Sequence, residues 1–257
     1  MQAPLAPIRR LGRATPRGLP DFFLQLGVWF GFLFAYQIAR GLGHHDATQA
    51  FVNGRLVISF EQKLHALIEV DVQDVIVRSG GWLVHAVNWT YWNSQFTVVG
   101  LALLWVYFKR NDSFLRLRNV LLLANMLALV GFVLMPTAPP RFFPEWGFVD
   151  TLAASSMLNH GSGIVQLAAN QYAAMPSIHA ADALILGFFM TSLVNSRVAK
   201  VLWTLWPSWV WFSVLATGNH FWLDVAAGVG LAALAGSIVV WAEGARRRTA
   251  LDRTALP

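Results

Sequence analysis

The sequence predicts an all-α protein, a bundle of six transmembrane helices with an amphipathic helix on the extracytoplasmic side. Three observations lead to this fold class. The chain of 257 residues is 56% hydrophobic and only 12% charged, which is typical of a membrane protein. Six apolar segments approach the roughly 20 residues that a helix needs to cross a bilayer. Most of the Lys and Arg residues lie on one side of these segments.

The predicted spans are residues 22–39, 83–108, 119–135, 178–195, 200–217 and 220–242. Residues 1–21 and 243–257 form basic tails around this single membrane domain. Fourteen of the 19 Lys and Arg residues lie in the tails and in the short connections after the second and fourth spans. The positive-inside rule therefore places both termini in the cytoplasm. The long connections 40–82 and 136–177 then face outward.

Shorter patterns define the remaining elements. Between Ser59 and Val77, apolar residues recur at helical spacing among acidic ones, which predicts an amphipathic helix that lies on the membrane or caps the bundle. Prolines just after the third span end that helix. Gly228 and Gly230 in the last span predict close contact with a neighbouring helix.

The composition also limits the partners. The chain has no cysteine, so disulfide and thiolate chemistry are excluded. Its net charge of +6 is explained by topology and by contact with anionic membrane lipids. The run Arg246 to Arg248 has no interleaved aromatic residues, so we expect no nucleic-acid partner. The oligomeric state is left open.

Three polar segments fall at the same outer face in this topology. They are Pro139-Pro140-Arg141, Met175-Pro176-Ser177-Ile178-His179 and Gly218-Asn219-His220-Phe221-Trp222-Leu223-Asp224. Each lies at or near the end of a predicted span. Their coincidence at one face predicts a functional site there.

His220 and Asp224 are four residues apart and therefore share one face of a helix. The carboxylate can accept a proton from one ring nitrogen, which leaves the other facing a substrate as a nucleophile or base. The structural alternative is an interfacial histidine beside a solvated aspartate. An acid inside a span is costly unless it has a partner, which favours the pair.

Phosphate is the ligand that the other two segments favour. Pro176 suits the first turn of a helix, so the fourth span begins with an amide-rich terminus at the outer face, where Ser177 can add a hydrogen bond. His179 is then placed to protonate a leaving oxygen, and the Arg141 guanidinium suits phosphate. The alternatives are a serine cap and a lipid-headgroup anchor. Two histidines beside an arginine suit a metal poorly, so we expect neither metal nor cofactor.

Asp182 follows His179 by about one helical turn. An acid at this depth is a functional candidate, contacting the acceptor or headgroup or acting on His179. A salt bridge to a neighbouring helix is an equal alternative.

At these residues the sequence resembles the type 2 phosphatidic acid phosphatase superfamily, the membrane lipid phosphatases and phosphotransferases that work through histidine. It is most similar to the branch that holds the inositol phosphorylceramide synthases and their bacterial relatives. The resemblance implies that His220 becomes a phosphohistidine and that Asp224 orients it. It also implies that His179 protonates the leaving group and then acts as a base for the acceptor. Arg141, Ser177 and Asn219 would hold the phosphoryl oxygens, without a metal.

The chain departs from the common pattern of this superfamily in its phosphate-binding cations, since that pattern also has a lysine and an arginine in its first motif. Where that pattern has an arginine six residues before the nucleophilic histidine, this chain has Val214. Arg141 is the one clear match to the usual set of phosphate-binding cations. This departure agrees better with the synthase branch than with the simple phosphatases.

The substrate stays open at the level of sequence. A phospholipid donor with an alcohol acceptor would give transfer of an inositol phosphate-type headgroup, whereas a polyprenyl phosphate or diphosphate with water would give hydrolysis. A proton-coupled lipid transporter or flippase is the rival from another class, but no internal repeat of that kind is evident. The resemblance implies a bacterial inner membrane.

Overall fold

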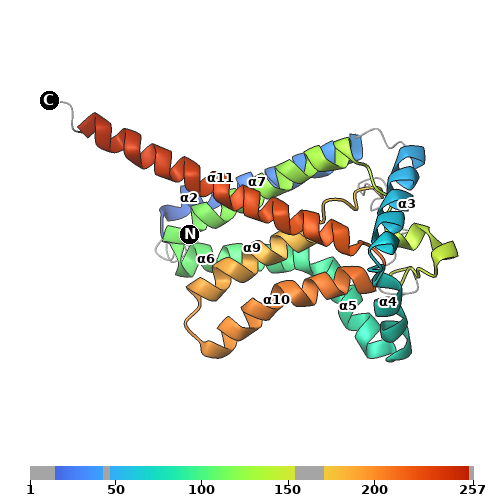
Figure 1. Cartoon of the computed structure of the whole chain (residues 1–257). Helices are drawn as coiled ribbons and strands as arrows, with labels where there is room; N and C mark the ends of the chain where they lie inside the picture. Colours follow the sequence, from blue (N-terminus) through green and yellow to red (C-terminus); the bar gives the residue numbers. More distant parts are fainter. Residues whose placement is uncertain (1–14, 43–46, 154–170, 255–257) are drawn as a thin grey trace, which may run out of the picture.

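The computed structural model describes residues 15–42, 47–153 and 171–254. These residues form helices and connecting turns, and a single isolated bridge between Thr137 and Ala173 is their only β-type pairing. Figure 1 shows long helices running side by side, with short helices across one end. The all-α prediction is confirmed for this part of the chain.

Three helices are long and apolar enough to cross a membrane. They are α2 (Gly18–Leu42), α7 (Asn111–Leu134) and α11 (Trp222–Thr254), with qualifying stretches Gly18–Tyr36, Asn111–Leu134 and Trp222–Thr249. α9 (Ile178–Leu193) is apolar but shorter. α10 (Arg197–Ala216) carries several tryptophans, and the count of six spans stays a prediction.

The predicted span 83–108 is not one regular α-helix. It consists of α5 (Gly81–Asn93), the π-helical turn η1 (Ser94–Val98) and α6 (Val99–Lys109). A π-helical turn inserts residues into the regular ladder and so redirects the helix that follows. The sequence pattern could not predict this change, because the apolar residues continue through it.

The single amphipathic helix predicted from Ser59 to Val77 is wrong. α3 (Ala47–Lys63) ends before a turn in which His65 has a φ of 55°, and α4 (Glu69–Arg78) begins after it. Two of the acidic residues also face inward, because Glu61 and Glu69 are fully buried while the apolar Phe60 and Leu64 are exposed. Both helices lie across the end of the bundle (Figure 1).

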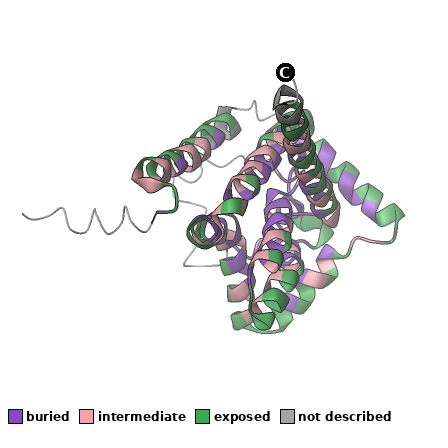
Figure 2. Ribbon diagram, turned by 90° about the vertical axis from the view of Figure 1, so that its left-hand side faces the viewer, coloured by how far each residue is buried: buried purple, intermediate pink, exposed green. Residues whose placement is uncertain are grey.

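The apolar core lies among α6, α7, α9 and α11, with Val106, Leu121, Leu186 and Ala235 at its centre. α2 lies at the edge and keeps most side chains at least partly exposed (Figure 2). Close approaches join the helices. A Cβ at Gly187 would meet the Pro207 ring at 2.6 Å, and one at Gly228 would meet the Ser177 carbonyl oxygen at 2.2 Å. Gly230 has no heavy atom within 4 Å of such a Cβ, so only Gly228 makes the predicted contact.

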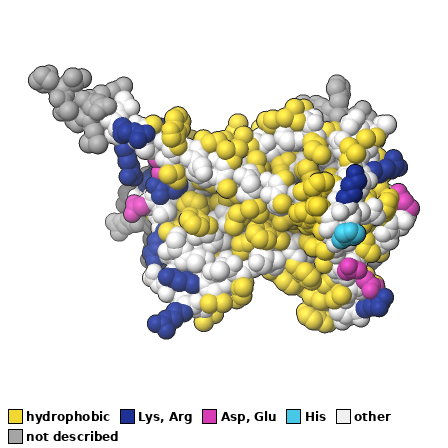
Figure 3. All heavy atoms as spheres, viewed as in Figure 1, with side chains coloured by type: hydrophobic (Ala, Val, Ile, Leu, Met, Phe, Trp, Pro, Cys, Tyr) yellow, Lys and Arg dark blue, Asp and Glu magenta, His cyan; other side chains and the backbone are white. Residues whose placement is uncertain are grey.

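The two ends of the bundle differ in charge. Figure 3 shows hydrophobic side chains over the middle of one face and many Lys and Arg side chains at the end where α11 finishes. That end holds Lys109, Arg110, Arg116, Arg197, Lys200 and Arg246 to Arg248. Arg116 forms an ion pair with Glu243 of α11, with a shortest N–O distance of 2.5 Å. The opposite end holds α3, α4 and the start of α11.

Candidate active site

The two histidines lie together at the end opposite the basic one. The ring centroids of His179 and His220 are 5.7 Å apart, although 41 positions separate them in the chain. Both line a small pocket whose other walls are Tyr91, Pro139, Arg141, Gln171, Ala173, Ala174, Ile178 and Asn219. The structure thus brings His179, His220, Arg141 and Asn219 to one place.

His220 sits in the turn that leads into α11 and is 4% exposed. Its Nδ1 lies 2.9 Å from the carbonyl oxygen of Ala174 and 3.4 Å from Oδ2 of Asp224. Because both neighbours are acceptors, the neutral ring carries its proton on Nδ1 and keeps the lone pair on Nε2. The expected pairing with Asp224 is present, and the Ala174 carbonyl is an additional partner at shorter distance.

Asp224 also shapes the start of α11. Its Oδ2 accepts a hydrogen bond of 2.9 Å from the backbone N–H of Phe221, in the manner of an acid in the first turn that reaches back to the helix cap. The side chain is fully buried. One carboxylate therefore holds both the helix start and the imidazole that precedes it.

Ser177 is placed differently from the expectation. Its hydroxyl oxygen accepts a 3.3 Å hydrogen bond from Ala180 N–H as the cap of α9, and the residue is fully buried. It is not among the pocket residues, whereas its neighbours Ile178 and His179 are. The start of α9 therefore faces the pocket through the residues after the cap, and phosphate binding by Ser177 stays a prediction.

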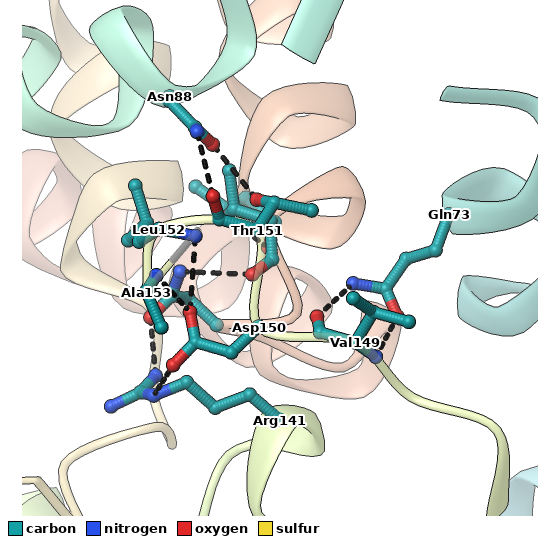
Figure 4. Close-up of polar contacts among 11 residues, drawn as sticks. Gln73, Asn88, Arg141, Val149, Asp150, Thr151, Leu152 and Ala153 are labelled. Atoms are coloured by element: carbon teal, nitrogen blue, oxygen red, sulfur yellow. Dashed lines mark hydrogen bonds and ion pairs between the residues drawn. The ribbon is translucent and has the colours of Figure 1, made fainter. Parts of the chain in front are cut away.

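Arg141 is held on several sides. Its backbone N–H donates to Gly218 (2.9 Å), its guanidinium donates to Oδ1 of Asn219, and Nε lies 3.8 Å from Oδ2 of Asp150. Asp150 also accepts from the N–H groups of Leu152 and Ala153, as Figure 4 shows. These contacts fix the guanidinium of Arg141, which among the described residues is the one Lys or Arg side chain that lines the pocket.

The segment that carries Asp150 is bound to the helices beneath it (Figure 4). The Gln73 side-chain amide accepts from Val149 N–H (3.0 Å) and donates to Val149 O (2.7 Å). The Asn88 side chain donates to Thr151 O (3.0 Å) and accepts from the Thr151 hydroxyl (2.8 Å). Main-chain and side-chain bonds of this kind fix the loop, and so fix the carboxylate beside Arg141.

Asp182 lies one turn deeper in α9 and is buried. Its Oδ1 accepts a 2.9 Å hydrogen bond from the Asn125 amide of α7. The partner is thus a neutral side chain of a neighbouring helix rather than a cation. Asp182 does not line the pocket of the two histidines, so its contact with an acceptor or headgroup stays a prediction.

Three further contributors are not among the site residues predicted from the sequence. Tyr91 stacks on the His179 ring, with centroids 4.5 Å apart and an interplanar angle of 22°. Glu61 and Glu69 accept hydrogen bonds from the backbone N–H groups of Leu223 and Trp222. Their positions in an amphipathic pattern gave no sign that they face inward. Among the described residues, no three His, Asp or Glu side chains are grouped as a metal site would need, and the absence of a metal stays a prediction.

Comparison with known proteins agrees with this geometry. The family model of the PAP2 superfamily matches residues 55–238, which include both histidines, Asp224 and Arg141. The chain belongs to the PAP2 superfamily. Three of its described helices are long and apolar enough to cross a membrane.

One curated relative supports the branch indicated by the sequence motifs. The chain is 26% identical over 148 residues to a phosphoinositol dihydroceramide synthase of Bacteroides thetaiotaomicron. The alignment covers 50% of this chain and 47% of the relative, so the chain matches about half the length of that protein. No solved structure matches the chain significantly.

Proposed function

We propose that this PAP2 enzyme transfers a phosphoryl-containing group from a lipid through a phosphohistidine at His220. The observation that carries the proposal is the single pocket that His179, His220 and Arg141 line together. The Nδ1 contacts to Ala174 and Asp224 leave the Nε2 lone pair as the nucleophile. Arg141 supplies the positive charge that phosphoryl oxygens need.

The reaction takes two balanced steps. Nε2 of His220 bonds to phosphorus while the bond from phosphorus to the leaving oxygen breaks, and His179 gives its proton to that oxygen. In the second step His179 takes the proton of the acceptor hydroxyl, the acceptor oxygen bonds to phosphorus, and the bond from phosphorus to Nε2 breaks. The negative charge of Asp224 stabilises the imidazolium in between.

The acceptor decides between hydrolysis and transfer. The relative named as a phosphoinositol dihydroceramide synthase favours transfer of an inositol phosphate-type headgroup to the hydroxyl of a lipid. Val214 occupies the position where the simple phosphatases carry an arginine, which is consistent with that branch. Dephosphorylation of a polyprenyl phosphate or diphosphate is the second candidate, in which water enters as the acceptor.

The membrane arrangement that we propose has six spans, with α5 to α6, α9 and α10 crossing beside the three long apolar helices. The basic residues at one end support cytoplasmic termini, and the pocket at the opposite end supports an extracytoplasmic active site. The bacterial relative supports an inner-membrane location. A lipid transporter would need ionisable groups along the membrane depth, whereas the histidines here lie at one end.

Purified protein in liposomes, supplied with a panel of lipid phosphates and phosphatidylinositol plus a ceramide, tests the proposal. We expect either phosphate release or headgroup transfer, with activity lost in His220→Ala and an acid-labile phosphoprotein formed only when His220 is present. His85→Ala is the matched control, because His85 is exposed on α5 and outside the pocket. Full activity of His220→Ala would refute the phosphohistidine route, and the product distinguishes hydrolysis from transfer.

A further inference from the structure

The first amides of α11 are bound in an unusual way. Three successive N–H groups, those of Phe221, Trp222 and Leu223, each donate to a carboxylate. The acceptors are Asp224 Oδ2 at 2.9 Å, Glu69 Oε1 at 2.5 Å and Glu61 Oε1 at 3.2 Å. Glu69 and Glu61 come from α4 and α3, more than 150 positions earlier. These amides directly follow His220 in the chain.

The two glutamates are buried as a pair. Both are 0% exposed, and the two side chains interact with each other. Among the described residues, Oε2 of Glu61 and Oε2 of Glu69 have no donor. Two neighbouring buried carboxylates without a cation favour a state that holds a proton, because one carboxyl group can then donate to the other.

The titration of the pair agrees with this geometry. Burial, and then the charge of Glu69, raise the pKa of Glu61 to about 9. Burial raises the pKa of Glu69 to about 7. Among the described residues, Asp224 of the α11 turn is the further charged group that acts on both glutamates, and His220 contacts Asp224 in turn. The pair therefore holds at least one proton at neutral pH and loses the last one on the alkaline side.

We propose that Glu61 and Glu69 are positioning residues of the active site. They share a proton and hold the start of α11 in place through its amides, so that His220 faces the pocket. The inference rests on the proposed role of His220 as the nucleophile. The same contacts also indicate which groups of the site bind the substrate phosphate. Because carboxylates occupy the amides of α11, the substrate phosphate is left with the start of α9 and Arg141.

Loss of the shared proton should weaken the hold of the two glutamates on the start of α11. A second negative charge would then face the carboxylate of Asp224, and the two glutamates would repel each other. Since the folded-state pKa values lie above the ordinary value of 4.5, the folded state binds more protons than the unfolded state between about pH 4.5 and pH 9. The contribution of this pair to stability is thus fully present below this window and is lost as pH rises through it. Activity should also fall on its alkaline side.

The test compares two substitutions at one position. In Glu61→Gln the amide oxygen can still accept from Leu223 and the amide nitrogen can donate to Glu69, as the protonated carboxyl does. We expect kcat within about twofold of wild type and an alkaline limb moved to higher pH, since position 61 can no longer lose a proton. In Glu61→Leu we expect kcat to fall about tenfold or more with KM changed less than about threefold.

The control is Asp71→Asn, which removes an exposed acid of α4 and should change neither kcat nor the pH profile. Melting temperature in detergent is measured for every variant. Wild-type kcat per folded protein in Glu61→Leu, or an unmoved alkaline limb in Glu61→Gln, would overturn the inference. If Glu61→Leu does not fold, the pH profile of Glu61→Gln decides alone. Retained activity in His220→Ala would refute the proposed function separately.

Discussion

His220 is held by two acceptors of different kinds, a main-chain carbonyl and a carboxylate. The carbonyl of Ala174 is the nearer to Nδ1, at 2.9 Å against 3.4 Å for Asp224. The carbonyl can fix the tautomer and the ring orientation, but it has no charge with which to balance an imidazolium. Orientation and charge balance are therefore supplied by different groups.

Asp224→Asn separates these two contributions. An asparagine oxygen can still accept from Phe221 N–H, and the Ala174 carbonyl still orients the ring, but the negative charge is lost. We expect kcat to fall on the order of 10²-fold, equal to about 2.7 kcal/mol, while the melting temperature changes little. Assays beside His220→Ala check this. If Asp224→Asn is as inactive as His220→Ala, the carbonyl does not orient the nucleophile.

Several site residues could be predicted from sequence because their signals are local. His220 and Asp224 are one helical turn apart, and Pro176 marks the start of the helix that carries His179. Tyr91, Glu61 and Glu69 give no such signal, since their partners lie far along the chain. The Ala174 carbonyl gives none either, because any residue type supplies one. Ser177 is the opposite case. Its place before His179 suggested phosphate binding, whereas in the structure its side chain caps α9.

At the scale of elements, α9 and α11 determine the distance between the histidines. They approach closely where Gly228 faces Ser177, and a Cβ there would lie 2.2 Å from the Ser177 carbonyl oxygen and 3.2 Å from Ala180 Cβ. The first obstacle is backbone, which cannot rotate away as a side chain can. Any side chain at position 228 must push the two helices apart.

Gly228→Ala should therefore lower both activity and stability. We expect kcat to fall at least about tenfold and the melting temperature to drop by several degrees, as for other overpacked contacts. Gly230→Ala is the matched control, since no heavy atom lies within 4 Å of its Cβ and alanine favours the helix. Circular-dichroism melting and the liposome assay measure both. Equal behaviour of the two variants would contradict the proposed role of this contact.

The elements that sequence periodicity missed were those with a change of backbone geometry. His65 adopts a positive φ and ends α3, although its neighbours continue the helical pattern. η1 changes the helical hydrogen-bond pattern from α to π in the middle of a continuous apolar segment. Neither change interrupts the apolar pattern. The existence of the long helices α7 and α11 was predicted because their apolar pattern is uniform, but α7 begins before residue 119, at Asn111, and α11 continues beyond residue 242, to Thr254.

At the scale of the whole molecule, charge and chemistry occupy opposite ends of one bundle. Arg110, Arg197 and Lys200 lie at the end opposite the pocket of His179 and His220. The positive-inside rule then predicts that the pocket lies outside the cytoplasm. In that arrangement, which we propose, a lipid headgroup reaches the histidines from the outer leaflet.

The absence of cysteine in the chain allows this orientation to be tested directly. Glu145→Cys places a thiol on an exposed residue of η3 (Pro144–Trp146) near the pocket end, and Lys200→Cys places one at the basic end. In intact cells, we expect an impermeant maleimide to label position 145 and not position 200, with both labelled after permeabilisation. The reversed pattern would place the active site in the cytoplasm.

The close contact between Gly187 of α9 and Pro207 of α10 affects how this helix pair can enter the membrane. Pro207 has no N–H to donate to Trp203, and its ring packs where Gly187 has no side chain. Only residues 194–196 connect the two helices, and the Thr191 and Thr204 hydroxyls lie 3.2 Å apart across them. The Trp203 carbonyl, which Pro207 leaves without its helical donor, thus lies against Gly187 of α9 instead of facing lipid. In the six-span arrangement that we propose, the two helices are suited to leave the translocon together as a hairpin.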